Sequence, residues 1–263
     1  MPIPERLNPT LRSASTLAVD RLEDARNRLI VALDVPDAAS AAALVRQVEG
    51  SCRWFKVGLE LFVAAGPAVL EPLLAGGYSV FLDLKFHDIP NTVASAVRSA
   101  AALGARMMTV HAAGGPAMLA AAREALEGVN NPPELLAVTV LTSMGQLQMD
   151  AIGLNRPPSQ QVELLARMGM EAGIKGFVCS AKEVAALRSL TGPESILVIP
   201  GIRPAGAESG DQMRTAAPGV AIRQGASYLV VGRPITQAAD PAEAAEAILK
   251  EMAAEIATGL PDY

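Results

Sequence analysis

The chain alternates short apolar runs with longer, alanine-rich amphipathic segments, and this alternation constrains its fold more than any other feature. Such runs are typical of buried parallel strands, and the amphipathic segments are typical of helices that cover a parallel sheet. The runs predict strands at residues 29–34, 54–57, 79–84, 107–111, 135–141, 176–179, 196–199 and 228–231. The predicted helices are residues 38–49, 59–75, 90–103, 116–126, 159–172, 181–190, 217–224 and 241–256.

Eight such units without a linker favour an α/β fold that is a single closed (β/α)8 TIM barrel. The 263 residues, 51% of them hydrophobic, are enough for a sizeable core. An open, doubly wound sheet is the alternative, but Asp34 stands where that fold would have a glycine-rich dinucleotide loop. We expect residues 1–27 to form an N-terminal extension and residues 28–263 to form the barrel domain.

Charge and composition narrow the possible partners and location. The net charge of −5 and the 3% aromatic content argue against nucleic-acid binding. No apolar run reaches the length of a membrane span, and the N-terminus lacks the apolar core of a signal peptide. Cys52 and Cys179 have neither metal-site nor disulfide spacing, so we interpret them as buried, inert thiols. These features predict a cytoplasmic protein.

Polar side chains follow the predicted carboxyl ends of the strands, where TIM barrels place their active sites. In strand order they are Asp34; Lys56; Asp83, Lys85 and Asp88; His111; Thr142 and Ser143; Ser180 and Lys182; Arg203; and Gly232 with Arg233. This ring exceeds what a purely structural barrel needs. It therefore predicts an active site at this end of the barrel.

Residues 81–92 carry the densest part of the ring. Asp83 and Lys85 are two positions apart on a strand and so share a face. Buried charges of this kind must pair with one another or with a ligand. One interpretation is a salt-bridged strand end followed by a helix cap at Asp88. The rest of the ring favours the other interpretation, a catalytic charge array.

The loops after the seventh and eighth predicted strands indicate a phosphate site, as is common in this fold. Gly232 would let the backbone approach an anion, and Arg233 could bind phosphate oxygens in bidentate fashion. Arg203 and Gln212, in the long loop 203–216, could add donors. The alternative is a pair of solvated arginines beside turn glycines.

Three other polar residues near the ring receive structural interpretations. His87 alternates away from Lys85, and His111 is expected to be an inner-rim histidine with its hydrogen bonds satisfied. Glu60 is interpreted as a charge at a helix N-terminus. No cluster has the spacing of a zinc, iron–sulfur or dinucleotide site, so no metal ligand is predicted.

Longer motifs occur in a fixed order from the first predicted strand to the last helix. They are Val31-Ala-Leu-Asp34, Phe55-Lys-Val-Gly58, Phe81-Leu-Asp-Leu-Lys-Phe-His-Asp-Ile-Pro-Asn-Thr-Val93, Leu141-Thr-Ser143, Pro200-Gly-Ile-Arg203, Asp211-Gln212 and Val231-Gly-Arg-Pro-Ile-Thr236. Together they resemble the orotidine 5′-phosphate decarboxylase family. The block around Lys85 is highly specific. The departures from the family pattern are the N-terminal extension and some relaxed spacing before Gln212.

The resemblance implies decarboxylation of orotidine 5′-phosphate to UMP in pyrimidine nucleotide synthesis, with no metal or organic cofactor, by a homodimer with shared active sites. It implies four catalytic residues, Lys56, Asp83, Lys85 and Asp88. By similarity, Lys85 is the proton donor to the pyrimidine carbon and Asp83 lies beside the departing carboxylate. Lys56 and Asp34 would hold the ribose hydroxyls.

The resemblance also assigns the remaining substrate contacts. Asp88, Ile89 and Thr92 would contact the substrate, and Asp88 and Thr92 would do so across a dimer interface, at the neighbour's ribose. Thr142, with Ser143 nearby, would recognise the amide edge of the pyrimidine. The phosphate would be held by Arg203, Gln212, Gly232 and Arg233.

Two rival functions stay open from the sequence. Related barrels that decarboxylate or condense sugar phosphates share the shorter D-x-K-x-x-D motif, but they tend to use a metal-binding glutamate near the second strand, where this chain has Lys56. A non-catalytic phosphate-binding barrel, acting as a sensor or scaffold, is the second rival. The complete charged rim argues against it.

Overall fold

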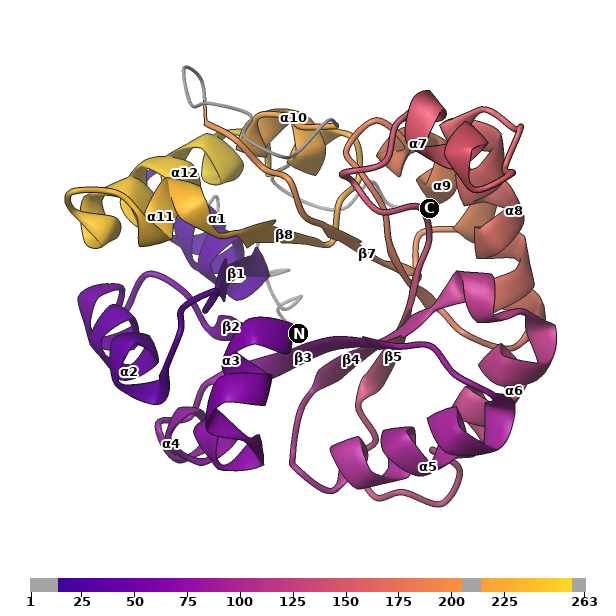
Figure 1. Cartoon of the computed structure of the whole chain (residues 1–263). Coiled ribbons are helices and arrows are strands. Elements are labelled where there is room, and N and C mark those ends of the chain that lie inside the picture. Colours follow the sequence, from indigo (N-terminus) through magenta and orange to yellow (C-terminus); the bar gives the residue numbers. More distant parts are fainter. Residues whose placement is uncertain (1–13, 205–213, 257–263) are drawn as a thin grey trace, which may run out of the picture.

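Eight parallel strands close into a barrel in chain order, with β1 pairing with both β2 and β8 (Figure 1). This computed structural model describes residues 14–204 and 214–256. The strands are β1 (Leu29–Ala32), β2 (Trp54–Gly58), β3 (Ser79–Phe86), β4 (Met107–His111), β5 (Glu134–Val138), β6 (Gly176–Val178), β7 (Ile196–Ile199) and β8 (Tyr228–Val231). The predicted TIM barrel is confirmed.

Helices surround the barrel on its outside (Figure 1). They are α1 (Ala14–Arg28), α2 (Ala38–Gln47), α3 (Leu59–Ala65), α4 (Leu70–Ala75), α5 (Pro90–Ala101), α6 (Pro116–Glu124), α7 (Gln146–Ala151), α8 (Pro158–Glu171), α9 (Val184–Thr191), α10 (Pro218–Arg223), α11 (Arg233–Thr236) and α12 (Pro241–Glu255), with 3-10 turns η1 (Pro67–Val69) and η2 (Ala112–Gly114). Within the described ranges, no helix combines the length and the apolarity that crossing a membrane requires.

The prediction of one continuous helix over residues 59–75 is wrong. The chain breaks at Gly66, whose φ is 69°, and Pro67 follows directly. Glycine adopts positive φ at little cost, and proline has no N–H to continue the helical ladder. The segment therefore forms α3, η1 and α4. The short helices α7 and α11, of 6 and 4 residues, were not predicted because so few residues carry too little periodicity.

The strand predicted over residues 135–141 is shorter than expected at its carboxyl end. Regular pairing ends at Val138, although the backbone N–H of Thr139 still donates to the carbonyl of Val178 at 3.1 Å. The next two carbonyls, of Val140 and Leu141, accept hydrogen bonds from the side chain of Arg214 instead. An arginine distant in sequence thus replaces the neighbouring strand as the partner of this backbone.

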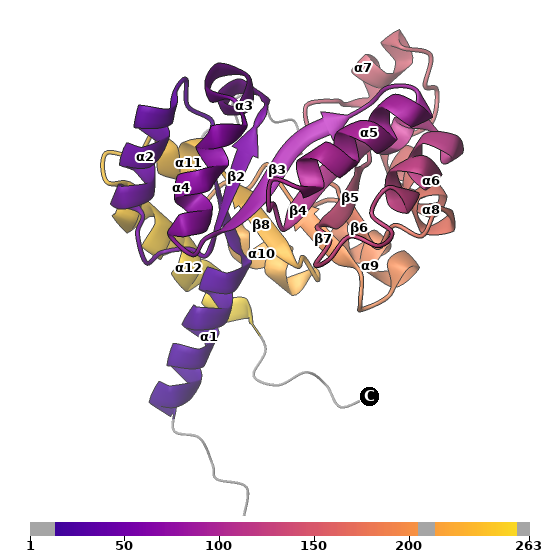
Figure 2. The ribbon, with the colours of Figure 1, turned by 90° about the horizontal axis from the view of Figure 1, so that it is seen from below.

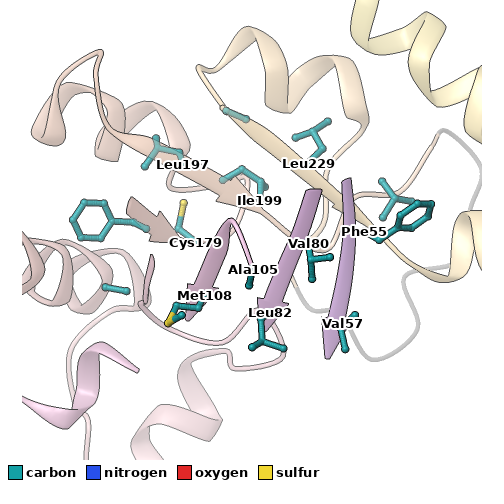
Figure 3. Packing of buried hydrophobic residues seen from close by; sticks show 14 of the residues in the cluster. Phe55, Val57, Val80, Leu82, Ala105, Met108, Cys179, Leu197, Ile199 and Leu229 are labelled. Carbon is teal, nitrogen blue, oxygen red and sulfur yellow. The ribbon is translucent and has the colours of Figure 1, made fainter. Parts of the chain in front are cut away.

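Side chains alternate along the strands between two apolar clusters. The cluster inside the barrel contains Ile30, Ala32, Phe81, Met107, Leu136, Val138, Val178, Val198 and Val230. The larger cluster lies between the strands and the surrounding helices and includes Phe55, Val80, Leu82, Met108 and Ile199 (Figure 3). In β3, Leu82 and Leu84 belong to or pack against the outer cluster, whereas Phe81 is in the inner one. The same alternation turns Asp83 and Lys85 towards the barrel axis.

Arginine side chains hold the amino-terminal end of the barrel. Figure 2 shows α1 at this end and α3 and α7 at the opposite end. Arg28, the last residue of α1, donates to the carbonyls of Ala226 and Ser227 just before β8. Arg188 of α9 donates to the carbonyls of Gly192, Pro193, Ser195 and Gly225 and to the hydroxyl of Ser227. These bonds tie α9 to the segments that enter β7 and β8.

We expect Arg188→Leu to lower the free energy of unfolding by about 2–4 kcal/mol, because several carbonyls lose a charged donor. The measurement is urea unfolding followed by circular dichroism. Arg167→Leu is the matched control, since Arg167 makes an exposed pair with Glu163 on α8 and should change stability by only about 0.5 kcal/mol. Equal losses in the two variants would contradict this account.

Candidate active site

Four charged side chains form a chain of alternating sign at the carboxyl ends of β1, β2 and β3. The Lys56 ammonium lies 2.8 Å from Oδ1 of Asp34 and 3.8 Å from Oδ2 of Asp83. The Lys85 ammonium lies 2.8 Å from the same Asp83 oxygen. Asp83 and Lys85 therefore share a face, as their spacing predicted. Two carboxylates and two ammonium groups balance in charge, which lets them occupy a partly buried position.

Burial of the array increases towards its centre. The exposed fractions of the side chains are 51% for Asp34, 10% for Lys56, 11% for Asp83 and 30% for Lys85. Gly58 leaves the room that this arrangement needs, because a Cβ there would lie 2.7 Å from Nζ of Lys56. Solvent therefore screens the two central charges less than it screens Asp34 and Lys85.

Thr109 of β4, which the sequence interpretation missed, holds the array from below. Its hydroxyl donates to Oδ1 of Asp83 at 3.0 Å and accepts the backbone N–H of Lys85 at 2.8 Å. Thr109 is fully buried. The available signal was a polar residue at an inward-facing position within the strand, two residues after the inward-facing Met107.

The backbone of β3 is irregular where the array is built. Leu82 pairs with Met108 and Phe86 pairs with Val110, so four steps along β3 match two steps along β4. Within this irregularity Lys85 has a φ of 49°, an unusual value for a residue with a side chain. Irregularities of this type re-aim side chains next to functional sites. Here the backbone N–H of Lys85 donates to the Thr109 hydroxyl while its ammonium pairs with Asp83 at the cavity.

A cavity of about 480 Å³ lies above the array. It is lined by residues from most strand ends: Ala32, Asp34, Lys56, Glu60, Phe81, Asp83, Lys85, Val138, Val140, Leu141, Thr142, Ser143, Val178, Cys179, Pro200, Gly201, Arg203, Val230, Gly232, Arg233 and Gln237. The cavity thus brings together nine of the predicted substrate contacts: Asp34, Lys56, Asp83, Lys85, Thr142, Ser143, Arg203, Gly232 and Arg233. Its volume suits a nucleotide-sized ligand.

For several other residues, the lining of the cavity differs from the ring predicted from the sequence. Glu60, read as a helix-end charge, also lines the cavity, and so does Gln237, which the sequence did not single out. Ser180 and Lys182 do not line it. Gln212 lies outside the described residues. In the described part of the chain, no group of three or more His, Cys, Asp or Glu side chains is arranged to hold a metal ion.

Polar groups at the carboxyl ends of β7 and β8 line the cavity. Gly232 is the N-cap of α11, and Arg233 is the first residue of that helix. Arg203 follows β7, and its guanidinium donates to the carbonyl of Ile202 at 2.8 Å. A Cβ at Gly232 would lie 3.6 Å from Oδ2 of Asp34. Two guanidinium groups at neighbouring strand ends are suited to an anion.

Asp88, Ile89 and Thr92 do not line this cavity. Asp88 and Thr92 line a shallower hollow beside it, together with Lys85 and His87. The Asp88 carboxylate accepts the backbone N–H of Ile89 at 2.6 Å, and all three predicted residues are exposed. Lys85 belongs to both hollows, so this exposed surface adjoins the charge array directly.

His87, which lines the shallower hollow, stacks on His111. Their ring centroids are 5.3 Å apart with an interplanar angle of 27°. The expectation that His111 has its hydrogen bonds satisfied is wrong, because its buried Nδ1 has no partner among the described residues. Burial, and then the nearby His87 and Lys85 charges, lower the pKa of His111. The lowered pKa favours the neutral imidazole, which adds no positive charge beside Lys85.

Comparisons with known proteins agree with this geometry. Residues 27–248 match the family model described as the Orotidine 5′-phosphate decarboxylase / HUMPS family. The chain is 50% identical to the orotidine 5′-phosphate decarboxylase of Moorella thermoacetica over 234 residues, which are 87% of this chain and 93% of the relative. It is 51% identical to that of Nitrosococcus oceani over 228 residues, 86% of this chain and 98% of the relative.

A solved structure gives the same result. The crystal structure of orotidine 5′-phosphate decarboxylase from Lactobacillus acidophilus superposes with a TM-score of 0.75 at 39% identity, covering 86% of this chain and 99% of that one. The fold, the charge array and the matched sequence cover the same part of the chain. The chain belongs to the orotidine 5′-phosphate decarboxylase family.

Proposed function

We propose that the Asp34–Lys56–Asp83–Lys85 array carries out the decarboxylation of orotidine 5′-phosphate to UMP and carbon dioxide, the activity of this family. The observation that carries the proposal is the Lys85 ammonium, held 2.8 Å from a buried carboxylate at the floor of a nucleotide-sized cavity. Family membership supplies the reaction. The geometry supports the role of each residue.

Lys85 acts at the carbon that loses the carboxylate. When the bond to the carboxylate breaks, its electron pair stays on the ring carbon and carbon dioxide leaves. The pair then takes a proton from Nζ of Lys85, and solvent returns a proton to the neutral amine. A fixed cation at the position of developing negative charge stabilises the transition state without reorganising.

Asp83 orients Lys85 and disfavours a second carboxylate nearby. Its carboxylate is shared between Lys85, Lys56 and Thr109, so it fixes the positions of both ammonium groups. Lys56 and Asp34, on the β1 and β2 side of the array, face the ribose hydroxyls. Thr142 and Ser143, after β5, contact the amide edge of the pyrimidine.

Arg233, Arg203 and Gly232, with Gln212 from the adjoining loop, bind the phosphate. The position of Arg203, Gly232 and Arg233 at the ends of β7 and β8 supports this role, as does the bidentate geometry of guanidinium on phosphate. The phosphate takes no part in the bond that breaks. Its binding energy contributes by fixing the pyrimidine over Lys85.

The active protein is proposed to be a homodimer that shares its active sites. Asp88, Ile89 and Thr92 are exposed next to Lys85, where a second subunit could complete the site. Exposed apolar side chains lie on segments that follow β2, β3 and β5: Leu59, Val63, Ile89, Leu147 and Ile152. Burying such residues drives subunit association. Asp88 and Thr92 would then reach the partner's ribose.

The remaining proposals concern organisation and location. Residues 28–263 are proposed as the catalytic domain and residues 1–27 as an extension, supported by the start of the family match at residue 27 and by the packing of α1 on α12 outside the strands. The buried cysteines Cys52 and Cys179 are unpaired, which supports a reducing, cytoplasmic location. Burial raises the pKa of the Cys52 thiol to about 12, so it is inert.

We expect Lys85→Ala to lower turnover by at least about 10³-fold while UMP still binds, because the proton donor is lost but the phosphate and ribose contacts remain. Turnover is followed by ultraviolet absorbance of orotidine 5′-phosphate, and UMP binding by calorimetry. Lys250→Ala, at an exposed position of α12, is the control. Substantial residual turnover in Lys85→Ala would reject the proton-donor role.

Mixing Lys85→Ala with Asp88→Ala protein should regenerate activity, because a mixed dimer has one site with both residues intact. Subunits are exchanged in mild denaturant and assayed after refolding. A mixture of Lys85→Ala with Lys56→Ala is the matched control and should stay inactive, since both residues come from the same subunit of each site. No recovery in the first mixture would contradict a shared site.

Arg233→Ala should weaken UMP binding about 10- to 100-fold, the loss expected for a charge-assisted bidentate contact. Uridine, which lacks the phosphate, serves as the matched ligand and should bind the variant and the unmodified protein equally. Calorimetry measures both ligands. If UMP affinity is unchanged, Arg233 does not contact the phosphate.

A further inference from the structure

Behind the cavity wall, a second buried ion pair joins Glu183 and Arg214. Nη1 of Arg214 lies 2.8 Å from Oε1 of Glu183, and the two side chains are 6% and 7% exposed. Glu183 immediately precedes α9, and Arg214 lies between β7 and α10. Neither residue lines the cavity, and neither is used by the proposed chemistry.

The pair connects three strand ends through hydrogen bonds. The other Glu183 oxygen accepts the backbone N–H and the hydroxyl of Ser180, just after β6. Nη2 of Arg214 donates to the carbonyls of Val140 at 2.8 Å and of Leu141 at 2.9 Å, just after β5. Two residues beyond Arg214, Ala216 pairs with Ile202, just after β7.

The position of these contacts matters for substrate recognition. Val140 and Leu141 directly precede Thr142 and Ser143, and all four line the cavity. Their carbonyls have left the sheet, so Arg214 supplies the hydrogen bonds that the neighbouring strand no longer provides. Nε of Arg214 has no acceptor among the described residues. The hydrogen bonds of its guanidinium therefore go through Nη1 to Glu183 and through Nη2 to this backbone.

We propose that Glu183 and Arg214 are positioning residues for pyrimidine recognition. Glu183 fixes the guanidinium, the guanidinium fixes the backbone of Val140 and Leu141, and that backbone places Thr142 and Ser143 against the base. A buried ion pair adds little net stability compared with an apolar pair, but it imposes a defined geometry. This inference rests on the proposed assignment of Thr142 and Ser143 to the pyrimidine.

The test separates positioning from folding with two variants. Arg214→Met leaves the buried Glu183 charge unpaired and should destabilise the protein. In Glu183→Leu/Arg214→Met both charges are gone, so much of the stability should return, yet the two carbonyls still lack their donor. Stability is measured by urea unfolding, and the affinities of UMP and of ribose 5-phosphate are measured by calorimetry on the full-length protein.

We expect UMP affinity to fall about 10- to 100-fold in both variants, the loss typical of a slightly misplaced recognition group, while ribose 5-phosphate affinity is unchanged. Arg223→Met, which removes an exposed pair with Glu255, is the matched control and should bind both ligands normally. Recovery of UMP affinity together with stability in the double variant would overturn the proposal, because the pair would then serve folding only. A parallel loss of both ligands would also overturn it.

Thr142→Ala distinguishes this inference from the assignment on which it rests. If that variant binds UMP normally, the pyrimidine assignment itself fails. If Thr142→Ala weakens UMP binding but the Arg214 variants do not, the assignment stands and only the positioning role of Glu183 and Arg214 is rejected.

Discussion

The buried carboxylate of Asp83 is the group on which the active end of this barrel depends. Its side chain is 11% exposed and accepts hydrogen bonds from Lys85 and Thr109, and the Lys56 ammonium lies 3.8 Å from its Oδ2. A carboxylate at this depth is costly without such partners, and the partners come from three consecutive strands. The register of β2, β3 and β4 therefore sets the distances between these groups. A shift of any of these strands would separate the charges.

The sequence was sufficient for the fold and for the charge array because both follow from short-range periodicity. Residues two apart on a strand share a face, so the Asp83–Lys85 pair could be read directly. The break at Gly66 was missed because apolar residues continue on both sides of it. Thr109 and the Glu183–Arg214 pair were missed for another reason. The only local mark of Thr109 was a polar side chain on the inward face of β4. The roles of Thr109 and of the Glu183–Arg214 pair depend on contacts between residues 26 and 31 positions apart.

Stabilising and chemical groups occupy opposite ends of the barrel. At the amino-terminal end, Arg28 and Arg188 place their charges on backbone carbonyls that enter the strands. At the carboxyl end, lysines and aspartates are paired with one another and face a cavity. Arg214 binds backbone carbonyls, as Arg28 and Arg188 do, but it lies at the carboxyl end of the barrel. Its partners, Val140 and Leu141, line the cavity. This division is the one expected of a TIM-barrel enzyme.

The irregular stretch of β3 makes the array sensitive to chain length rather than to residue size. Leu82 and Leu84 pack in the outer cluster beneath the helices, whereas Asp83 and Lys85 pair with each other inside the barrel. Removing one residue from this stretch would turn the leucines towards the cavity and the charged side chains into the outer cluster, because successive side chains face opposite sides of a strand. The pairing of Phe81 with Met107 on one side and of Phe86 with Val110 on the other prevents the strand from sliding to compensate. Relatives with this chemistry should therefore vary freely in loop length elsewhere while the count of residues between those two pairings stays constant.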